Sequence, residues 1–273
     1  HGHADHARPG HGTVWATPAT LAVMRTRLGE AAFGRGVPLP YRQPIALGDV
    51  RLWLAPAGHV LGSAQVVLEH AGGRVVYSGD YKRRADPTTE PFTPVRCDVF
   101  ITEATFGLPV FRQPPVAGEV AKLLASLATF PERCHVVGAY ALGKAQRLIA
   151  ELRAHGYDRP VHLHGALLPL CRLYEQFGVA LGPVAAATVG EKGRARADLA
   201  GEIVIAPPSA IADRWARRLP EALPALASGW MQVRQRARQR GVELPLVISD
   251  HADWDELLAT AHEVQAGEIW ITH

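Results

Sequence analysis

Short apolar segments recur along the first 107 positions, and residues 50–55 alternate between apolar and polar side chains, which is typical of β-strands. This pattern predicts strands at residues 13–16, 50–55, 65–69, 74–78 and 99–102. One helix is expected among them, from Pro18 to about Leu28, because Thr17 supplies an N-cap and Pro18 a first-turn proline. The strands lead into polar residues of the types that bind metal ions.

The pattern changes after Gly107, where apolar residues recur every three or four positions and short apolar runs separate these segments. Helices are expected at 116–127, 143–154 and 166–177, and strands at 135–138, 161–163, 203–206 and 225–227. Strands that alternate with helices of this length favour parallel βαβ units in a doubly wound sheet.

The strand pattern of the first 107 residues returns from residue 244. We expect a strand at 245–249, a helix that Asp253 and Glu256 cap, and a strand at 268–272. The simplest architecture is one domain of residues 1–107 and 244–273, interrupted by an inserted α/β domain at 108–243. The chain opens on a ligand-type residue and closes on a strand-like run. We therefore expect a fragment that is trimmed at both ends.

Composition restricts the class of protein. A chain of 273 residues with 48% hydrophobic and 20% charged residues is long enough and apolar enough to bury a large core. No apolar run approaches the length that crosses a bilayer. The three cysteines, Cys97, Cys134 and Cys171, are odd in number and widely spaced, so we expect reduced thiols in a cytoplasmic protein.

Residues that can bind metal ions are concentrated at the start of the chain, at His1, His3, Asp5 and His6. Ligands at alternating and then adjacent positions can serve two divalent ions side by side, and imidazole and carboxylate groups suit zinc. A histidine cluster at the start of a sequence can also be a tag remnant or an adventitious metal binder.

More residues of these types follow predicted strands: His59, Asp80, Glu103, His251 and His273. A two-metal hydrolase needs about three protein ligands per ion, a bridging carboxylate, and a water between ions about 3.5–4 Å apart whose pKa they lower. The ligands that we expect fall into two sets around a bridging Asp80: His1, His3 and His59 for one zinc ion, and Asp5, His6 and His273 for the other.

Each of these residues has an ordinary interpretation when it is taken singly. A lone His59 or His273 is more often a surface or core histidine, and Asp80 can be a turn residue. The glycines that precede His59 and Asp80 permit a close approach of the backbone. The order of the whole set, at the ends of strands, favours the metal site.

Three segments resemble the successive ligand motifs of the metallo-β-lactamase superfamily: His1-Gly2-His3-Ala4-Asp5-His6, Ala57-Gly58-His59-Val60-Leu61-Gly62-Ser63 and Tyr77-Ser78-Gly79-Asp80. Three more resemble the additional motifs of its β-CASP branch of nucleases: Ile101-Thr102-Glu103, Ser249-Asp250-His251-Ala252-Asp253 and Ile271-Thr272-His273. Residues 138–146 resemble the Gly-(Arg/Lys)-Ala-Gln segment of that branch. Within the branch, segments 78–84, 103–107 and 206–210 most resemble the bacterial ligase-associated DNA exonucleases.

The resemblance implies a metallo-β-lactamase αββα sandwich, truncated at both ends, with an inserted β-CASP doubly wound α/β domain. It implies a zinc-dependent DNA exonuclease that acts in DNA repair or end processing, with the zinc ligands given above. It also implies that His251 is the general acid and that Glu103 orients or charges it. A histidine beside a carboxylate is held protonated near neutral pH, as an acid catalyst must be. Asp250 is interpreted as a salt bridge or a cap.

The net charge of +3 says little about partners, but basic residues gather at 82–84 and at Arg234, Arg236, Arg238 and Arg240. Either cluster can be a solvated face or a phosphate contact. The candidate phosphate or nucleic-acid contacts are Lys82, Arg83, Lys144 and Ser209. Because aromatic residues make up only 7% of the chain, we expect phosphate-led, salt-dependent binding rather than base stacking.

We expect a single-stranded DNA substrate, with RNA possible, and by resemblance an association with a DNA ligase or helicase. In this interpretation a hydroxide shared by the metals attacks phosphorus in line and His251 protonates the leaving sugar oxygen. Three alternatives remain: an RNA-processing nuclease on the same scaffold, a small-molecule metallo-hydrolase, and a non-catalytic nucleic-acid-binding scaffold. The long insertion and the Glu103/His251 pair argue against the second, and the filled ligand positions argue against the third.

Overall fold

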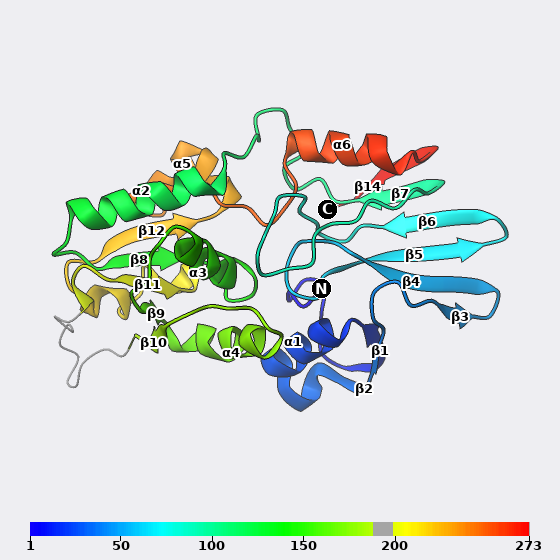
Figure 1. Cartoon of the computed structure of the whole chain (residues 1–273), viewed down its shortest axis with the longest axis horizontal. Helices are drawn as coiled ribbons and strands as arrows, with labels where there is room; N and C mark the ends of the chain where they lie inside the picture. The colour runs from blue at the N-terminus through cyan, green and yellow to red at the C-terminus, as the bar shows by residue number, and fades with distance from the viewer. Residues whose placement is uncertain (188–198, 273) are drawn as a thin grey trace. The chain divides into compact units, whose positions relative to one another are not determined.

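The computed structural model describes residues 1–187 and 199–272 and places them in a mixed α/β fold with several sheets (Figure 1). The chain forms two compact units. Unit 1 comprises His1–Arg112 and the C-terminal segment that begins at Asp250, and unit 2 comprises Gln113–Ser249. Both boundaries fall five or six residues after the expected ones, in part because Phe111 packs against Phe106 and its carbonyl accepts a hydrogen bond from Trp254 N–H.

Unit 1 is built around a six-stranded sheet with the order β14-β7-β6-β5-β4-β3. Its strands are β3 (Ile45–Leu47), β4 (Val50–Pro56), β5 (Ala64–His70), β6 (Gly73–Tyr77), β7 (Val99–Thr102) and β14 (Glu268–Ile271). Strands β3 to β6 are antiparallel neighbours, whereas β7 is parallel to both β6 and β14. Therefore β4, β6 and β7 all end at the same edge of the sheet.

Buried apolar residues pack one face of this sheet against a helix. Val67, Val76 and Phe100 lie on neighbouring strands and are fully or almost fully buried in one cluster with Val264 of helix α6 (Trp254–Val264). The helix begins as predicted, because the Asp253 carboxylate accepts from Glu256 N–H and the Glu256 carboxylate accepts from Asp253 N–H.

A smaller parallel sheet pairs β1 (His11–Ala16) with β2 (Phe33–Pro38) and packs with α1 (Pro18–Leu28) and the 3₁₀ helix η1 (Gly29–Ala32). The Thr17 hydroxyl caps α1 by accepting a hydrogen bond from Thr20 N–H, which confirms the predicted start. Strand β2 was not expected from the sequence, because the two glycines in Phe33–Pro38 interrupt any alternation of side chains.

Unit 2 contains a six-stranded sheet in which all pairings are parallel, with the order β10-β9-β11-β8-β12-β13. Its strands are β8 (His135–Gly138), β9 (Val161–Leu163), β10 (Val184–Ala186), β11 (Ile203–Ala206), β12 (Leu223–Ala227) and β13 (Leu244–Leu246). The central strands β8 and β11 are buried along their whole length, as continuous apolar runs in parallel sheets usually are.

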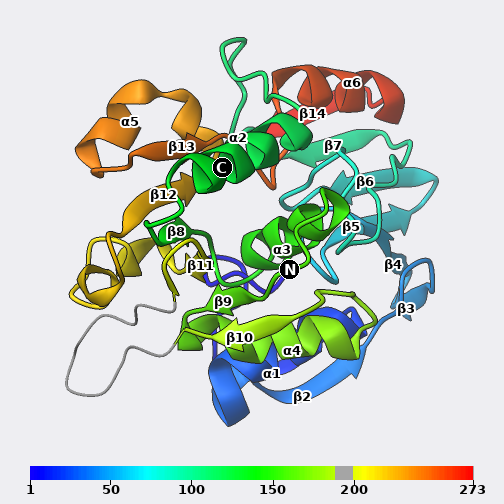
Figure 2. The same ribbon diagram turned by 60° about the vertical axis from the view of Figure 1, so that its left-hand side comes forward.

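The helices of unit 2 are α2 (Val116–Thr129), α3 (Lys144–Ala154), α4 (Leu168–Gln176) and α5 (Arg234–Gln239), with short 3₁₀ turns η2 (Gly165–Leu167), η5 (Pro208–Ala210), η6 (Ala216–Arg218) and η7 (Gly229–Gln232). Helices α2 and α3 contact each other (Figure 2). The βαβ alternation predicted from the sequence is therefore present. Strand β10 and helix α5 were not expected, because each is short and carries a weak apolar pattern.

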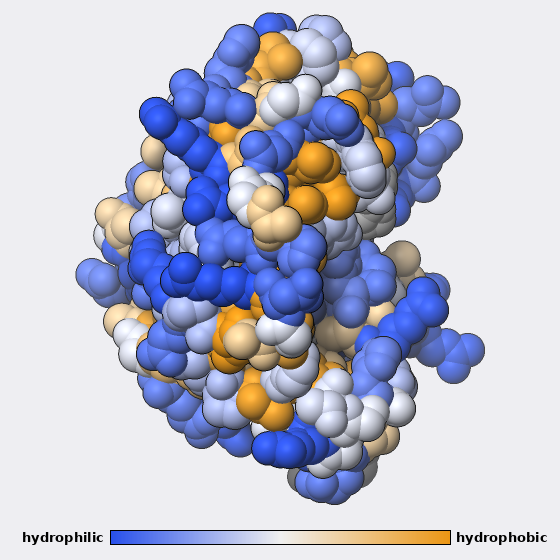
Figure 3. Space-filling model, turned by 90° about the vertical axis from the view of Figure 1, so that its right-hand side faces the viewer, coloured by the Kyte–Doolittle hydropathy of each residue, from blue (hydrophilic) through white to orange (hydrophobic). Residues whose placement is uncertain are grey.

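The surface of unit 1 includes an uncovered edge at β14, where Trp270 and Ile271 are 55% and 74% exposed. On the face of the molecule that Figure 3 shows, apolar residues form separate patches among hydrophilic ones. Within the described ranges, none of the helices combines the length and the apolar character that a bilayer crossing requires.

Candidate metal centre

The candidate ligands of unit 1 follow the strands that end at one edge of the sheet. His59 lies in the β4–β5 loop, Asp80 follows β6 and Glu103 follows β7. Because strand ends at one edge lie within about 4.7–4.9 Å of their neighbours, residues far apart in sequence meet there. His251 joins them from the segment that precedes α6.

The loop that carries His59 needs glycine at its start. Gly58 has a φ of +71°, and a Cβ atom there would lie 2.4 Å from the Lys82 carbonyl oxygen. The Ser63 hydroxyl then accepts hydrogen bonds from the backbone N–H groups of His59 and Val60, at 3.0 and 3.2 Å. The His59 side chain is therefore held by a rigid backbone.

The N-terminal turn is anchored separately. The His3 carbonyl accepts hydrogen bonds from His6 N–H and Ala7 N–H, at 3.2 and 2.8 Å. Ala7 is buried with Met24 of α1, and the Arg27 guanidinium donates to the Gly2 carbonyl. These contacts fix a short polar segment that has little apolar surface of its own.

Four of the predicted ligands form one group. His1, His3, His59 and Asp80 each offer a ligand atom, and these atoms all lie within 4.8 Å of one another. The His59 Nε2 and His3 Nδ1 atoms are 3.1 Å apart, and the Asp80 Oδ2 atom is 3.5 Å from His1 Nε2 and 3.7 Å from His59 Nε2. A tetrahedral zinc ion with bonds of about 2.0–2.1 Å separates its ligand atoms by about 3.3 Å. The spacing therefore fits a metal ion.

The environment of the group also fits a metal. The His1 side chain is only 2% exposed, and its buried Nε2 atom makes no hydrogen bond. Burial, and then repulsion from His251 and His3, lowers the pKa of His59 well below its ordinary value of 6.5. His59 is therefore neutral at physiological pH, which is the form that coordinates a cation.

The second predicted ligand set is only partly described. His1, Asp5 and His6 form a group of possible ligands, and His6 Nε2 lies 3.3 Å from Asp80 Oδ2. The Asp5 side chain is 61% exposed and lies 3.9 Å from His6 Nε2. His273, expected to complete this set, lies outside the described residues.

The predicted acid, His251, pairs with Glu103. Its Nδ1 atom lies 2.9 and 3.1 Å from the two Glu103 oxygens, and a ligand atom each from Asp80, Glu103 and His251 lie within 4.8 Å of one another. The buried Glu103 carboxylate also accepts from Tyr81 N–H at 2.7 Å and from the Thr105 hydroxyl at 2.6 Å. Glu103 is thus fixed on three sides, while His251 keeps 25% of its side chain exposed.

Sequence reasoning did not single out Thr105, nor Asp86 as a partner of Lys82. The Thr105 hydroxyl contacts both Glu103 and, at 3.4 Å, His251 Nδ1. Its place two residues after Glu103 was the available signal, but a hydroxyl near a carboxylate is too common in sequences to identify a partner.

The basic residues at 82–84 are engaged by acidic residues of unit 1. The Lys82 ammonium is enclosed and contacts Asp86, the His59 carbonyl at 3.3 Å and Asp250 at 3.9 Å. Arg83 makes a bidentate pair with Glu263, and Arg84 pairs with Asp253 and Glu256. A phosphate would have to compete with these carboxylates for either Lys82 or Arg83.

The other two candidate phosphate contacts lie in unit 2. Lys144, at the start of α3, is buried and its ammonium donates to the Ile248 carbonyl at 3.1 Å. Ser209 is exposed in the 3₁₀ turn that follows β11. Of the pair, only the Ser209 side chain is open to a ligand in this conformation.

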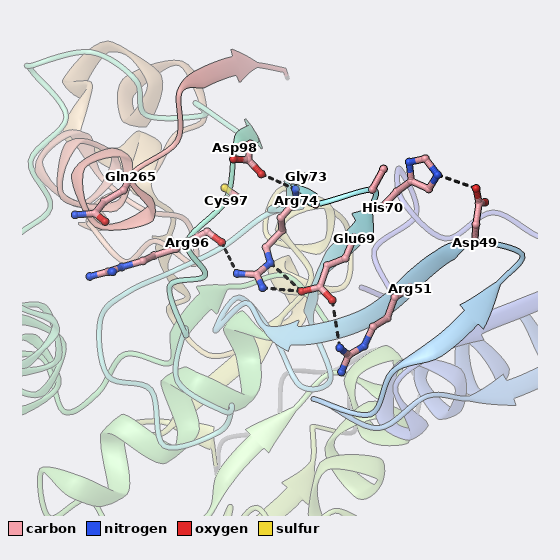
Figure 4. A pocket seen from close by; sticks show the side chains of 12 residues that line it. Asp49, Arg51, Glu69, His70, Gly73, Arg74, Arg96, Cys97, Asp98 and Gln265 are labelled. Carbon is pink, nitrogen blue, oxygen red and sulfur yellow. Dashed lines mark hydrogen bonds and ion pairs between the residues drawn. The ribbon is translucent and has the colours of Figure 1, made fainter.

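A pocket of about 660 Å³ lies at the other edge of the unit 1 sheet, near the starts of β4, β6 and β7 (Figure 4). Its charged groups satisfy one another: Glu69 pairs with Arg74 at 2.7 Å and with Arg51 at 3.6 Å, and His70 pairs with Asp49 at 2.7 Å. None of its lining residues belongs to a group of possible metal ligands within the described chain. The groups of possible metal ligands lie at the opposite edge.

Comparison with known proteins gives relatives that are similar to this chain in sequence. A protein named probable DNA ligase from Opitutus terrae is 32% identical over 283 aligned positions, which cover all of this chain and 26% of that protein. Ribonuclease TTHA0252 from Thermus thermophilus is 32% identical over 187 positions, which cover 59% of this chain and 43% of the ribonuclease. Endoribonuclease ysh1 from Emericella nidulans is 35% identical over 120 positions, 42% of this chain and 13% of that enzyme.

A crystal structure of a protein of unknown function from Enterococcus faecalis matches all of this chain and 74% of its own, with a TM-score of 0.63 at 15% identity. That likeness concerns the fold alone. No protein-family model matches the chain. The chain spans about a quarter of the first relative and less than half of the other two.

The histidine-aspartate group is a candidate metal site, and the mixed α/β architecture fits a metallo-β-lactamase-like fold. The relatives named above, two of which are named as ribonucleases, support the resemblance of the chain to the β-CASP branch of that superfamily. Members of this branch depend on metal ions.

Proposed function

We propose that the chain is the catalytic part of a metal-dependent nuclease that hydrolyses phosphodiester bonds. The observation that carries the proposal is the shared position of Asp80, which groups with His1, His3 and His59 on one side and with Glu103 and His251 on the other. A metal group and an acid–carboxylate pair that meet at one residue are parts that metal-assisted hydrolysis of a phosphodiester can use. The names of the ribonuclease relatives support the same reaction class.

We assign two zinc ions to the site, one to His1, His3 and His59 and one to Asp5, His6 and His273, with Asp80 shared. Bound there, the ions would supply Lewis acidity to the phosphoryl oxygens and to the attacking water. We assign unit 1 to the αββα sandwich and unit 2 to the inserted β-CASP domain. The matches of fold and sequence along the whole chain support this assignment.

His251 delivers the proton to the leaving sugar oxygen. The Glu103 carboxylate holds its Nδ1 atom at 2.9 Å, which orients the ring with its other nitrogen away from that carboxylate. Because the imidazole is partly exposed and its partner is buried, the proton donor can reach solvent and substrate while its orientation stays fixed. Thr105 and Tyr81 N–H orient Glu103 and so act on the reaction through it.

As substrate we propose single-stranded DNA, degraded from an end during DNA repair or end processing in association with a DNA ligase. The relative that matches the whole chain is named a probable DNA ligase, which supports this choice. The second candidate is an RNA-processing nuclease, which the names of the ribonuclease and endoribonuclease relatives favour.

The test is digestion of matched single-stranded DNA and RNA, each with a 5′-phosphate or a 5′-hydroxyl, together with metal analysis of the purified chain. We expect about two zinc ions per chain, faster loss of DNA than of RNA, and no hydrolysis after chelation. Faster loss of RNA would replace the DNA assignment with the ribonuclease. A chain that binds zinc but cleaves neither polymer would refute the nuclease.

A further inference from the structure

The arginines at 234–240 differ from the other basic cluster of the chain. Residues 222–242 contain no aspartate or glutamate, and Arg234, Arg236, Arg238 and Arg240 are all exposed. Within the described part of unit 2, none of the four guanidinium groups pairs with a carboxylate, whereas Arg133 pairs with Glu243 and Arg159 pairs with Glu202. Four neighbouring cations without counter-charges create a positive surface.

Helix α5 arranges these arginines around one anchored residue. Ala237 is buried in a cluster with Leu226 and Met231, so the helix has a defined inner side. At 100° per residue, Arg234 and Arg238 lie on one flank, Arg236 and Arg240 lie on the other, and glutamines face outward between them. The helix is therefore a ridge with a pair of arginines on each side.

The charges within each flank do not stabilise one another. Each flank holds like charges at i and i+4, which repel. Arg234 in the first turn opposes the helix dipole, whereas Arg236 and Arg238 in the last turn favour it. The helix has no side-chain cap and no acidic residue in its first turn. A bound polyanion would relieve the repulsion within each flank.

An aromatic residue beside the ridge indicates which polyanion. The Arg236 guanidinium carbon lies 4.0 Å from the centre of the Trp230 indole ring in η7. An arginine held against an indole keeps its N–H edge for a phosphate, while the planar guanidinium and the indole offer flat surfaces for a base. Positive charge alone would be enough to bind an acidic protein. The ridge combines its arginines with the Trp230 indole, and proteins that bind single-stranded nucleic acid use the same combination of charge and aromatic ring.

We propose that Arg234, Arg236, Arg238 and Arg240, with Trp230, form a second binding surface for single-stranded nucleic acid, which contacts the sugar–phosphate backbone. We call it the α5 surface. It rests on the proposed function in that its ligand is the substrate polymer of the nuclease. It adds an affinity site in unit 2 that is made of residues other than those assigned to the metals.

The experiment measures binding of a fluorescent 20-nucleotide single strand in EDTA, so that nothing is hydrolysed, over a range of salt concentrations. The test variant changes the four arginines of the α5 surface to glutamine. The control changes four other exposed arginines of unit 2 to glutamine: Arg172, Arg214, Arg217 and Arg218. Both variants lose the same charge, and circular dichroism and thermal melting check their folding.

We expect the test variant to bind at least about tenfold more weakly at low salt and the control to lose less than about threefold. Each lost phosphate contact lowers the slope of log affinity against log salt by about 0.7, so four contacts lower it by up to about 3. If the test variant melts early, the pairs R234Q/R238Q and R236Q/R240Q are measured separately, and each is expected to lose about half of that slope. Trp230→Leu should weaken binding with little change in slope.

Equal losses in the test and control variants, or unchanged binding, would overturn the α5 surface. So would a poly-glutamate probe whose binding depends on the four arginines more than binding of the oligonucleotide does, because the ligand would then be an acidic protein. Hydrolysis of a small phosphodiester by the zinc-loaded test variant should match that of the parent. If the parent hydrolyses nothing yet binds the oligonucleotide through α5, the nuclease proposal fails and the α5 surface stands.

Discussion

The two six-stranded sheets both bring loops together at the ends of their strands, but these loops carry different types of residue. In unit 1, the strands that end at one edge lead into His59, Asp80 and Glu103, which lie in groups of possible metal ligands. In unit 2, parallel strands β8, β11 and β12 lead into an alanine-tyrosine pair, a proline pair and Ser228. All groups of possible metal ligands in the described chain lie in unit 1. The strand topology brings loops together, and the residue types decide what the loops can bind.

The largest loss of activity is expected from a change at Asp80, which belongs both to the group with His59 and to the group with Glu103. Asp80→Asn keeps the shape of the side chain but removes a negative charge that neutralises metal ions. We expect metal content to fall and hydrolysis to drop by about 10³-fold or more. Metal analysis and a single-strand digestion assay measure the two effects. Asp49→Asn, at the opposite edge, is the control and should leave both unchanged.

A smaller loss of rate is expected at His251, and it distinguishes the role of the general acid from that of the metal ligands. His251→Ala should lower the rate of hydrolysis by about 10²- to 10⁴-fold, the contribution of a positioned acid, while zinc stays near two ions per chain. The assay follows a natural strand and one with an activated phenolic leaving group, which needs less protonation and should lose less rate. Loss of zinc along with the activity, or normal cleavage, would contradict the role assigned to His251.

The enclosed lysine gives a prediction about stability. Lys82→Met leaves Asp86 buried without its cation, and breaking a buried pair in this way destabilises a protein by about 3–5 kcal/mol. Urea unfolding measures the loss. The more exposed Arg83→Gln, which breaks the pair with Glu263, should cost at most about 1 kcal/mol. Equal losses would show that Lys82 is not the structural member of the basic cluster.

The smallest loss of rate is expected at Thr105, whose hydroxyl donates to Glu103. Thr105→Val removes a hydrogen bond to Glu103 and should lower kcat by about tenfold with little change in KM or metal content, because the carboxylate loses one of its fixed contacts. Thr105→Ser, which keeps the hydroxyl, should restore most of the rate. A serine variant as slow as valine would show that the methyl packing, rather than the hydrogen bond, matters.

Secondary structure was largely predictable wherever side chains repeat with a clear period. Strands β7, β8, β9 and β11 have the expected bounds, because each is a short, mainly apolar segment. The starts of α1 and α6 were predictable because caps act within four residues of sequence. Strand β2 was not, because its glycines carry no side chains to alternate.

The sequence by itself determined the order of strands and helices and the residue types that stand at their ends, because both depend on neighbours along the chain. Only the tertiary structure decided which of these residues meet. Lys82 and Arg234 both read as exposed cations in the sequence, yet Lys82 is enclosed by Asp86 and Asp250 while Arg234 stays exposed. Asp86 lies only four residues from Lys82, but Asp250 is distant in sequence. The position of such a distant counter-charge depends on how the loops pack, and local patterns carry no information about it.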